Sequence, residues 1–333
     1  MKRACSLNAN TDENSQRVPS DLKKTNYLRM KRIGYIFFRG FTLFISIIPF
    51  RILYWSSDFY SIVMQYVVHY RLKTITDNLK NSFPEKDDQE IKQIVRRYYR
   101  NLCDISLETI KGYSLSTKKI LSRYQCLNPE ITHKYYKENK DIIIAMSHYA
   151  NWEWGTQVAS KFFLHGPVTF YKPLSNEYFD NYLRQRRMKQ GMELCSIYKP
   201  KLLQRLTDEP PKAYFLVSDQ SPSPGKEKKA YWVKFLNQDT ACLHGIESYA
   251  KLFDLPVFYA DVQRVKRGHY TIELEEICTY PENTRRGEIT AKYMKKLEDI
   301  ILKKPDDWLW SHKRWKLNKP DEMLTDTFPR KLD

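Results

Sequence analysis

A histidine and a carboxylate lie close together in segment 148–153, which reads HYANWE in one-letter code and runs from His148 to Glu153. A histidine paired with a carboxylate can remove a proton from a hydroxyl group and so activate the oxygen as a nucleophile. An ionised Glu153 would hold one imidazole nitrogen of His148 as a donor and leave the other nitrogen free as a base. The pair therefore predicts a site for general-base chemistry.

The spacing of the pair indicates a junction between a strand and a helix. Residues on one helix face are three or four apart, so His148 and Glu153 do not share a face. The apolar run 142–146 comes just before them and is typical of a buried strand. Asn151 is expected to cap a helix that begins near Trp152, with Glu153 in its first turn, where the helix dipole favours a carboxylate. The alternative for His148 is a structural histidine beside an apolar run.

From residue 141 onward, short apolar runs alternate with helical patterns. The expected strands cover residues 142–146, 168–171, 214–217 and 257–262, with an antiparallel return over 270–274. The expected helices cover residues 152–163, 177–190, 243–253 and 290–303, and an amphipathic helix over 85–109 precedes them. This alternation predicts an α/β fold with a largely parallel mixed sheet flanked by helices.

Polar residues follow three of the expected strands. His148 follows the first, Lys172 the second, and Asp219 with Gln220 the third. Sites in open α/β sheets gather beyond the carboxyl ends of strands, so these residues are expected to converge. The alternative is an ordinary loop-lined rim, in which Asp219 is a turn residue.

The charge balance favours acidic partners. The chain has 333 residues, with 56 Lys and Arg against 39 Asp and Glu, which gives a net charge of +17. Such an excess suits nucleic acid, an anionic membrane face or an acidic protein, and it does not choose among them. The six cysteines are scattered without metal-site spacing, which indicates free thiols in a reducing compartment and no metal site, although an even number also permits disulfides.

The N-terminal third contains the most apolar stretch of the chain. Residues 1–26 are polar and are expected to form a flexible tail, and residues 27–72 are expected to form a helical membrane anchor. The uncharged run 40–50 has 11 residues, fewer than the roughly 20 needed to cross a bilayer. The anchor would either span the membrane, with Arg39 and Arg51 near its two surfaces, or lie partly in the interface. The alternative is a buried helical hairpin.

Segment 148–153 resembles the His-x-x-Asn-Trp-Glu motif of the bacterial lipid A biosynthesis acyltransferases, the late acyltransferases. They belong to the glycerol-phosphate and lysophospholipid acyltransferase superfamily, which is marked by His-x4-Asp/Glu. Other segments resemble the family in order, between residues 33 and 316. They are Asn78-Leu79 with Phe83-Pro84, Arg187 with Gly191, Asp219-Gln220, Phe235-Leu236-Asn237 with Thr240, and residues 305–316, which resemble Pro-x-x-Trp-Leu-Trp-x-His-x-Arg-Trp-Lys.

The resemblance implies a reaction and roles for residues. An acyl chain would pass from a thioester on acyl carrier protein to a hydroxyl of a lipid A precursor, with no metal and no cofactor beyond that co-substrate. His148 would take the hydroxyl proton and Glu153 would orient the imidazole. Asn151, Arg187 and Asp219 would contact substrate: backbone amides near Asn151 at the oxyanion, Arg187 at a phosphate or the oxyanion, and Asp219 at the hydroxyl or a second basic residue. For Arg187 the alternative is a solvated, basic helix face.

The resemblance also implies partners, a location and boundaries. The partners are acyl carrier protein, a lipid A precursor and the membrane, without nucleic acid, at the cytoplasmic face of the bacterial inner membrane. The acyltransferase domain would cover residues 73–320, followed by a C-terminal tail over 321–333. The tryptophans of residues 305–316 would form an aromatic and basic edge near anionic lipid, or pack in the core.

Two other functions stay open at this point. One is an acyltransferase for another membrane lipid, a lysophospholipid or a glycolipid. Glycerolipid enzymes usually have Asp where this chain has Glu153, and they carry a Phe-Pro-Glu-Gly-Thr-Arg-like motif that the sequence lacks. The other is a non-enzymatic basic protein associated with the membrane, which the net charge of +17 favours.

Overall fold

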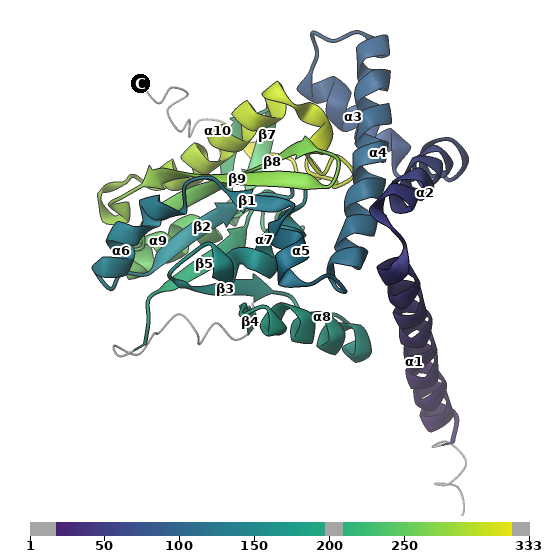
Figure 1. The fold of residues 1–333 in the computed structure, drawn as a ribbon. Coiled ribbons are helices and arrows are strands. Elements are labelled where there is room, and N and C mark those ends of the chain that lie inside the picture. Colours follow the sequence, from purple (N-terminus) through teal and green to yellow (C-terminus); the bar gives the residue numbers. More distant parts are fainter. Residues whose placement is uncertain (1–17, 197–208, 322–333) are drawn as a thin grey trace, which may run out of the picture.

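A seven-stranded sheet forms the centre of the protein (Figure 1). The computed structural model describes residues 18–196 and 209–321. Across the sheet the strands are β1 (Tyr124–Cys126), β9 (His269–Cys278), β8 (Val257–Lys266), β2 (Ile142–Met146), β5 (Lys212–Val217), β3 (Gly166–Tyr171) and β4 (Glu193–Ser196). All neighbours are parallel except β8 and β9. The prediction of a largely parallel mixed sheet flanked by helices is confirmed.

The central strands agree best with the sequence prediction. Strand β2 has the predicted bounds, and all five of its residues are buried, as expected for a strand covered on both faces. The antiparallel return of β9 along β8 is also confirmed, although both strands are longer than predicted. The short strands β1 and β4 were not predicted, because three or four residues carry too little pattern.

A separate hairpin of β6 (Tyr231–Phe235) and β7 (Gln238–Cys242) was also missed. Its two connecting residues, Leu236 and Asn237, have φ values of 49° and 64°. A two-residue hairpin turn with the twist of the strands needs positive φ at both positions, and asparagine tolerates this region better than most residues. Asn237 therefore fits a position where the family that the sequence resembles usually has glycine.

The predicted helices are present with small shifts in their ends. They are α4 (Asp88–Gly112), α7 (Trp152–Val158), α8 (Glu177–Lys189), α9 (Gly245–Phe253) and α10 (Glu288–Lys303), and the shorter helices are α3 (Leu72–Ser82), α5 (Thr117–Leu121) and α6 (His133–Lys137). Helix α4 starts later than expected because Asp87 caps it, in a reciprocal capping box with Glu90. Helix α7 is shorter than expected because it tightens into a 3-10 turn after Val158.

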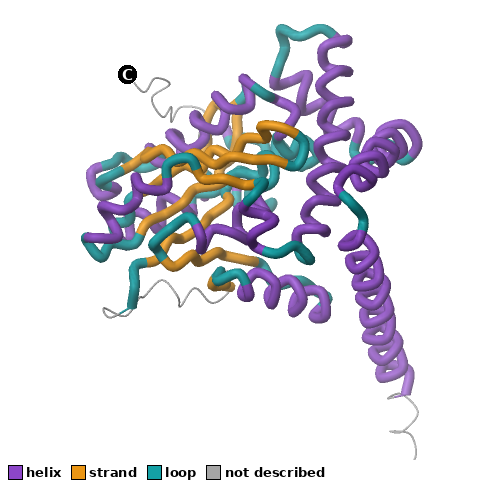
Figure 2. The backbone as a smooth tube through the Cα atoms, in the orientation of Figure 1, coloured by secondary structure: helices purple, strands orange, loops and turns teal. Residues whose placement is uncertain are grey.

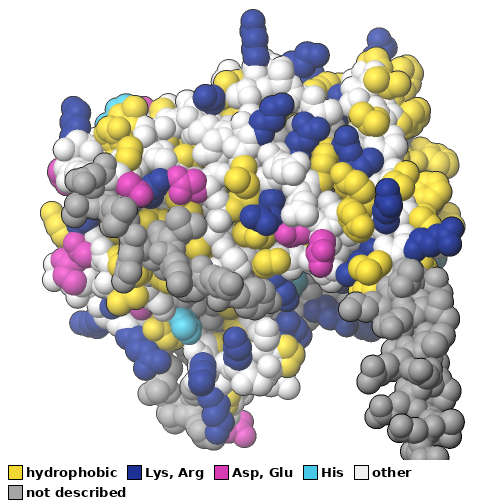
Figure 3. Space-filling model, turned by 90° about the horizontal axis from the view of Figure 1, so that it is seen from below, with side chains coloured by type: hydrophobic (Ala, Val, Ile, Leu, Met, Phe, Trp, Pro, Cys, Tyr) yellow, Lys and Arg dark blue, Asp and Glu magenta, His cyan; other side chains and the backbone are white. Residues whose placement is uncertain are grey.

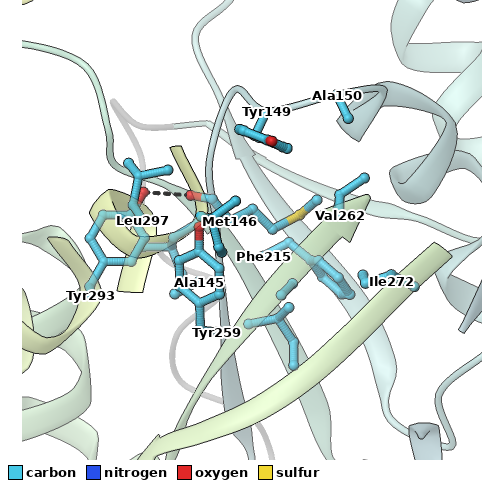
Figure 4. Packing of buried hydrophobic residues seen from close by; sticks show 14 of the residues in the cluster. Ala145, Met146, Tyr149, Ala150, Phe215, Tyr259, Val262, Ile272, Tyr293 and Leu297 are labelled. Carbon is cyan, nitrogen blue, oxygen red and sulfur yellow. Dashed lines mark hydrogen bonds between the residues drawn. The ribbon is translucent and has the colours of Figure 1, made fainter. Parts of the chain in front are cut away.

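The core fills the space between the sheet and the helices on its two faces. Figure 4 shows residues of this core around the end of β2. The Tyr293 hydroxyl on α10 donates a hydrogen bond of 2.7 Å to the carbonyl of Met146. Tyr149 and Ala150 lie in the loop that leaves the same strand (Figure 4). The loop that carries His148 therefore starts from a fully buried strand whose last carbonyl is hydrogen-bonded to α10.

The N-terminal segment is helical, as predicted, and its helices lie to one side of the sheet (Figure 2). Helix α1 (Val18–Ile47) extends away from the sheet, and α2 (Phe50–Ile62) continues into a π-helical turn, η1 (Val63–Val67). Because α1 begins at Val18, the stretch expected to be a tail is helical from that residue. The rest of that expected tail, residues 1–17, and the C-terminal stretch 322–333 lie outside the described residues.

Two of the three expectations for this segment, the spanning anchor and the buried hairpin, need correction. Among the helices of residues 18–196 and 209–321, none combines the length and the apolar character that crossing a bilayer requires, so a spanning anchor is wrong. A buried hairpin is also wrong, because Phe37 and Phe59 have exposed fractions of 75% and 64%. Charges within α1, such as Arg32 and Arg39, interrupt its apolar run, and apolar side chains on α1 and α2 point away from the core.

The end of α1 is held by a lysine from α4. Lys111 is 4% exposed, and its ammonium donates hydrogen bonds to the carbonyls of Ile45 (3.0 Å), Ser46 (3.0 Å) and Ile48 (2.6 Å). The last carbonyls of a helix have no partner within the helix, so a lysine there satisfies them. Burial lowers the pKa of Lys111. Helix α4 thereby fixes where α1 leaves the domain.

The cysteines agree with the prediction of free thiols as far as the structure extends. Cys103, Cys126, Cys195, Cys242 and Cys278 form no disulfide bond among the described residues. Cys5, the sixth, lies outside the described residues.

Candidate active site

His148 and Asp219 meet at the carboxyl ends of two neighbouring strands. The register of β2 and β5 pairs Met146 with Val217, and each candidate residue lies two positions further along its chain. The imidazole Nδ1 of His148 is 2.6 Å from Oδ1 of Asp219. The backbone N–H of His148 donates to Oδ2 of the same carboxylate at 2.9 Å. The indole N–H of Trp308 donates to Oδ2 at 3.0 Å.

The electrostatics of the pair favour an ionised carboxylate beside a basic imidazole. Asp219 is 2% exposed, and burial alone would raise its pKa, but His148 and the hydrogen bonds that Asp219 accepts hold the pKa below its ordinary value. Burial alone would lower the pKa of His148, but the adjacent carboxylate and its hydrogen bond raise it. The arrangement matches a protonated Nδ1 that donates to Asp219 and an Nε2 that is free to accept a proton.

The Nε2 side of His148 is partly open. The side chain is 19% exposed, and the Gln220 amide nitrogen lies 3.3 Å from Nε2. The Trp152 ring meets the imidazole edge to face, with ring centroids 4.9 Å apart. A hydroxyl group that displaces the Gln220 amide would reach the basic nitrogen directly.

The expected contact between Glu153 and His148 is wrong, because the carboxylate that contacts the imidazole belongs to Asp219. Glu153 lies in the first turn of α7, as predicted, but it faces α8. Arg187 donates to it from Nε (3.0 Å to Oε1) and from Nη2 (2.9 Å to each oxygen). Tyr113 donates a longer bond of 3.3 Å. A largely buried guanidinium needs a carboxylate partner, and Glu153 supplies it.

Arg187 is therefore not on a solvated helix face. Its side chain is 23% exposed, and although burial alone would lower its pKa, the charge of Glu153 raises it. Two of its nitrogens bind Glu153, whereas Nη1 makes no hydrogen bond to any described residue. A planar guanidinium held on one edge presents its other edge to an anion. Gly191, with φ of 85°, ends this helix in the left-handed conformation that favours glycine.

The side chain of Asn151 makes its hydrogen bonds within the protein. It caps α7 as predicted, because its Oδ1 accepts from the Trp154 backbone N–H at 3.1 Å. Its Nδ2 donates to Glu108 at 2.9 Å, and the residue is fully buried. Both ends of the amide are thus bound within the protein, and they fix the helix that carries Glu153.

Glu108 is a residue that sequence analysis missed. It is fully buried on α4 and accepts hydrogen bonds from the hydroxyls of Tyr54 (2.8 Å) and Tyr270 (2.5 Å) as well as from Asn151. Burial raises its pKa, partly opposed by these donors. The available signal was its place three residues after Ile105, so that an acid continues the apolar stripe of α4.

A second buried acid on the same helix, Asp104, was also missed. Asp104 is fully buried and accepts hydrogen bonds from Ser57 on α2 (2.6 Å) and Arg267 (2.6 Å), and it pairs with Arg264. Arg267 also binds Asp58 on α2, with Nη2 to Oδ1 at 2.8 Å. These contacts join α2, α4 and the β8–β9 hairpin, and they place the N-terminal helices next to the helix that holds Asn151.

The C-terminal segment 305–316 packs against Asp219 and against the loop that carries His148. Trp308 and Trp310 are 2% and 0% exposed, so the expected aromatic edge at a lipid surface is wrong for these two residues, and they pack in the core. The carbonyl of Asp307 accepts from the backbone N–H of Ala150 at 2.9 Å. Ala150 has φ of 49°, an uncommon conformation for alanine that this contact holds in place.

Two further contacts join the segments that resemble known motifs. The Asn78 amide donates to the carbonyls of Trp310 (2.9 Å) and His312 (3.0 Å). The indole of Trp315 donates to Thr240 on β7 at 2.7 Å. Segments that are widely separated in the sequence therefore converge behind Asp219.

A second histidine, His312, lies near the pair and was not predicted. Its Nε2 accepts from the backbone N–H of Ser221 at 3.1 Å. Burial and the nearby Arg314 charge lower its pKa to about 4. His312 is therefore neutral near pH 7 and acts as a hydrogen-bond acceptor that shapes the loop after Asp219.

Two comparisons bear on this site. A family described as bacterial lipid A biosynthesis acyltransferase matches residues 22–317, which includes every site residue described above. A search of curated proteins gave no match.

The His148 and Asp219 pair predicts a shift that can be measured directly. The substitution Asp219→Asn should lower the pKa of His148, because it removes the negative charge that stabilises the imidazolium. Histidine ring signals followed by NMR over pH 5 to 9 would give this pKa in both proteins. Glu153→Gln is the matched control and should shift the titration much less. An equal shift in the control would show that Glu153 governs the imidazole.

The buried Glu108 predicts a difference in stability between two substitutions. Glu108→Leu should lower the free energy of unfolding by at least about 3 kcal/mol, because three donors, two of them buried, lose their acceptor. Glu108→Gln keeps an acceptor oxygen and should cost less. Urea unfolding followed by circular dichroism gives both values. Equal costs would mean that shape, and not hydrogen bonding, is what matters at this position.

Proposed function

Because the chain belongs to the bacterial lipid A biosynthesis acyltransferase family, we propose that it transfers a fatty acyl chain from acyl carrier protein to a hydroxyl of a lipid A precursor. The single observation that carries this proposal is the imidazole of His148, 2.6 Å from a buried carboxylate and with Nε2 left to accept a proton. This arrangement suits the activation of an alcohol.

In the proposed reaction, His148 is the general base. Its Nε2 takes the proton of the acceptor hydroxyl as the oxygen attacks the thioester carbonyl carbon. Asp219 keeps Nδ1 protonated, so that Nε2 is the basic nitrogen, and stabilises the imidazolium that forms. The tetrahedral intermediate then collapses, the carbon–sulfur bond breaks, and the imidazolium returns its proton to the leaving thiolate. The ester forms without a covalent acyl-enzyme.

Arg187 has a proposed electrostatic role. Glu153 holds its guanidinium by one edge, and Nη1 remains for a phosphate of the acceptor or for the developing oxyanion. The role proposed for Glu153 is thus to position Arg187, and the role for Asn151 is to position the helix that carries Glu153. Neither role calls for a metal or a resident cofactor.

The proposed partners are acidic. Acyl carrier protein as donor and an anionic membrane face both suit a chain with a net charge of +17. The family supports a lipid A precursor as the substrate. The thioester donor and the particular hydroxyl are part of the proposal.

Membrane contact is proposed to occur through the N-terminal helices, at the cytoplasmic face of the bacterial inner membrane. Exposed apolar side chains follow one another along α1 and α2, among them Phe37 (75%), Phe44 (57%), Trp55 (62%) and Phe59 (64%). Figure 3 shows hydrophobic side chains with lysines and arginines among them on the side of the molecule where α1 and α2 lie. Apolar residues flanked by basic ones suit a position in the lipid interface.

Loss of the proposed base is the main test of the reaction. His148→Ala should lower acyl transfer by at least about a thousandfold, because it removes proton acceptance in the transition state. The assay follows an acyl-carrier-protein thioester and a lipid A precursor by mass spectrometry. His133→Ala, on α6, is the matched control and should keep full activity. Wild-type turnover in a folded His148→Ala protein would refute the mechanism.

Loss of the apolar side chains tests the membrane contact. The combined substitutions Phe37→Ser, Phe44→Ser, Trp55→Ser and Phe59→Ser should reduce binding to vesicles at least about a hundredfold, because burial of apolar surface drives such binding. Vesicle flotation measures it. Leu252→Ser with Val265→Ser changes exposed apolar residues on α9 and β8 and should have no effect. A quadruple variant that floats like the wild type would contradict the proposed face.

A further inference from the structure

A cavity of about 510 Å³ lies where η1, α3 and α4 meet, and none of the residues of the candidate active site lines it. Its lining is Gln65, Tyr66, Leu72, Thr76, Lys80, Asp88, Gln89, Ile91, Lys92, Gln93, Val95 and Arg96. The volume lies within the range of about 300 to 1,000 Å³ that is usual for small-molecule sites. The cavity therefore needs an explanation of its own.

The charged side chains of the cavity are mainly basic. Lys80, Lys92 and Arg96 face a single acid, Asp88, which is already paired with Lys80 at 2.7 Å. Lys92 and Arg96 make no ion pair within 4.0 Å with any described residue. Three cations around one acid leave an excess of positive charge at the rim of the cavity, which favours an anionic ligand, above all a phosphate.

A largely buried glutamine with its amide at the cavity is the strongest sign that the cavity takes a ligand. Gln65 is 9% exposed and lines the cavity, yet its side chain makes no hydrogen bond to any described residue. The amide nitrogen and oxygen of Gln65 are not cut off from solvent, so they meet the open space of the cavity, where a ligand can hydrogen-bond to them. Gln65 lies within the π-helical turn η1, a type of irregularity that is frequent at functional sites.

The other walls of the cavity are apolar and lead to an exposed apolar surface. Leu72 is half-buried, and Ile91 and Val95 are buried. Tyr66 lines the cavity and is itself 57% exposed, and Val67 and Val68 next to it are also exposed. A ligand that satisfies all of these walls has an anionic, hydrogen-bonding head joined to an apolar chain.

We propose that this cavity binds the headgroup of an anionic phospholipid. Lys92 and Arg96 contact the phosphate, Gln65 hydrogen-bonds to glycerol or ester oxygens, and the acyl chains leave past Leu72 and Tyr66. An acidic protein such as acyl carrier protein fits less well, because it would cover the basic rim without reaching the buried amide. The proposal rests on the membrane contact proposed for α2, which η1 continues directly.

The test uses the full chain and a soluble short-chain phosphatidylglycerol, so that binding is measured without vesicles. Calorimetric titration should give a Kd that rises at least about tenfold for Lys92→Ala with Arg96→Ala, because each charge near a phosphate contributes substantially. Lys118→Ala with Lys119→Ala, on α5, removes the same charge elsewhere and should leave Kd unchanged.

A second variant separates binding from folding. Gln65→Leu should weaken lipid binding about fivefold or more, yet keep or raise the melting temperature of the unliganded protein, because the amide it removes makes no hydrogen bond to any described residue. A purely structural glutamine would show the opposite pattern: a lower melting temperature with unchanged binding. Either that pattern or unchanged Kd values in both cavity variants would overturn the proposal.

Three further arms identify the ligand. Inorganic phosphate should bind much more weakly than the lipid; equal binding would indicate a free-phosphate site and overturn the lipid assignment. A zwitterionic short-chain phosphatidylcholine should also bind more weakly. If the cavity variants lose acyl carrier protein and keep the lipid, the cavity is a protein-docking site instead. None of these arms measures acyl transfer or vesicle flotation, so failure here is distinct from failure of the proposed function.

Discussion

The burial of Asp219 is the constraint on which the rest of the site depends. A carboxylate that is 2% exposed must be charge-compensated and fully hydrogen-bonded, or its ionised form is strongly destabilised. Its donors come from two distant parts of the chain: the ring and backbone of His148, and the indole of Trp308. At this buried position the carboxylate therefore stays ionised only because β2 pairs with β5 and the C-terminal segment packs against them. The basic imidazole is a product of the complete tertiary structure.

Two buried acids on α4 extend this dependence to the N-terminal helices. Glu108 accepts hydrogen bonds from Tyr54 on α2 and from Asn151 at the start of α7. Asp104 binds Ser57 on α2 and the two arginines of the β8–β9 hairpin. The helices whose apolar face is proposed to meet the membrane thus share buried polar contacts with the helix that carries Glu153. Displacing α2 would leave buried donors and acceptors unpaired close to the site, so the N-terminal helices are part of the same structural unit.

Local features and the convergence of His148 with Asp219 and Gln220 at the strand ends were predictable from the sequence, whereas the choice of Asp219 over Glu153 as the partner of the imidazole was not. Strand β2, the cap at Asn151 and the place of Glu153 in the first turn depend on a few adjacent residues. The partner of His148 depends on strand order, because Asp219 becomes its neighbour only when β5 pairs with β2. No rule of spacing within segment 148–153 contains that information. Hydropathy of the N-terminal segment likewise could not tell a spanning helix from one with an exposed apolar face.

In the structure, the five-residue separation of His148 and Glu153 places the two side chains next to different partners. The two side chains lie on either side of the helix cap at Asn151, and each has its own partner: a carboxylate for the imidazole and a guanidinium for Glu153. The cap fixes the direction in which the chain enters α7. It therefore also fixes the position of Nε2 of His148 relative to Arg187, which Glu153 binds. Acyl transfer needs a proton acceptor and a stabilised anion at a defined separation. A short motif centred on a buried cap can set that separation even though its two ends do not touch.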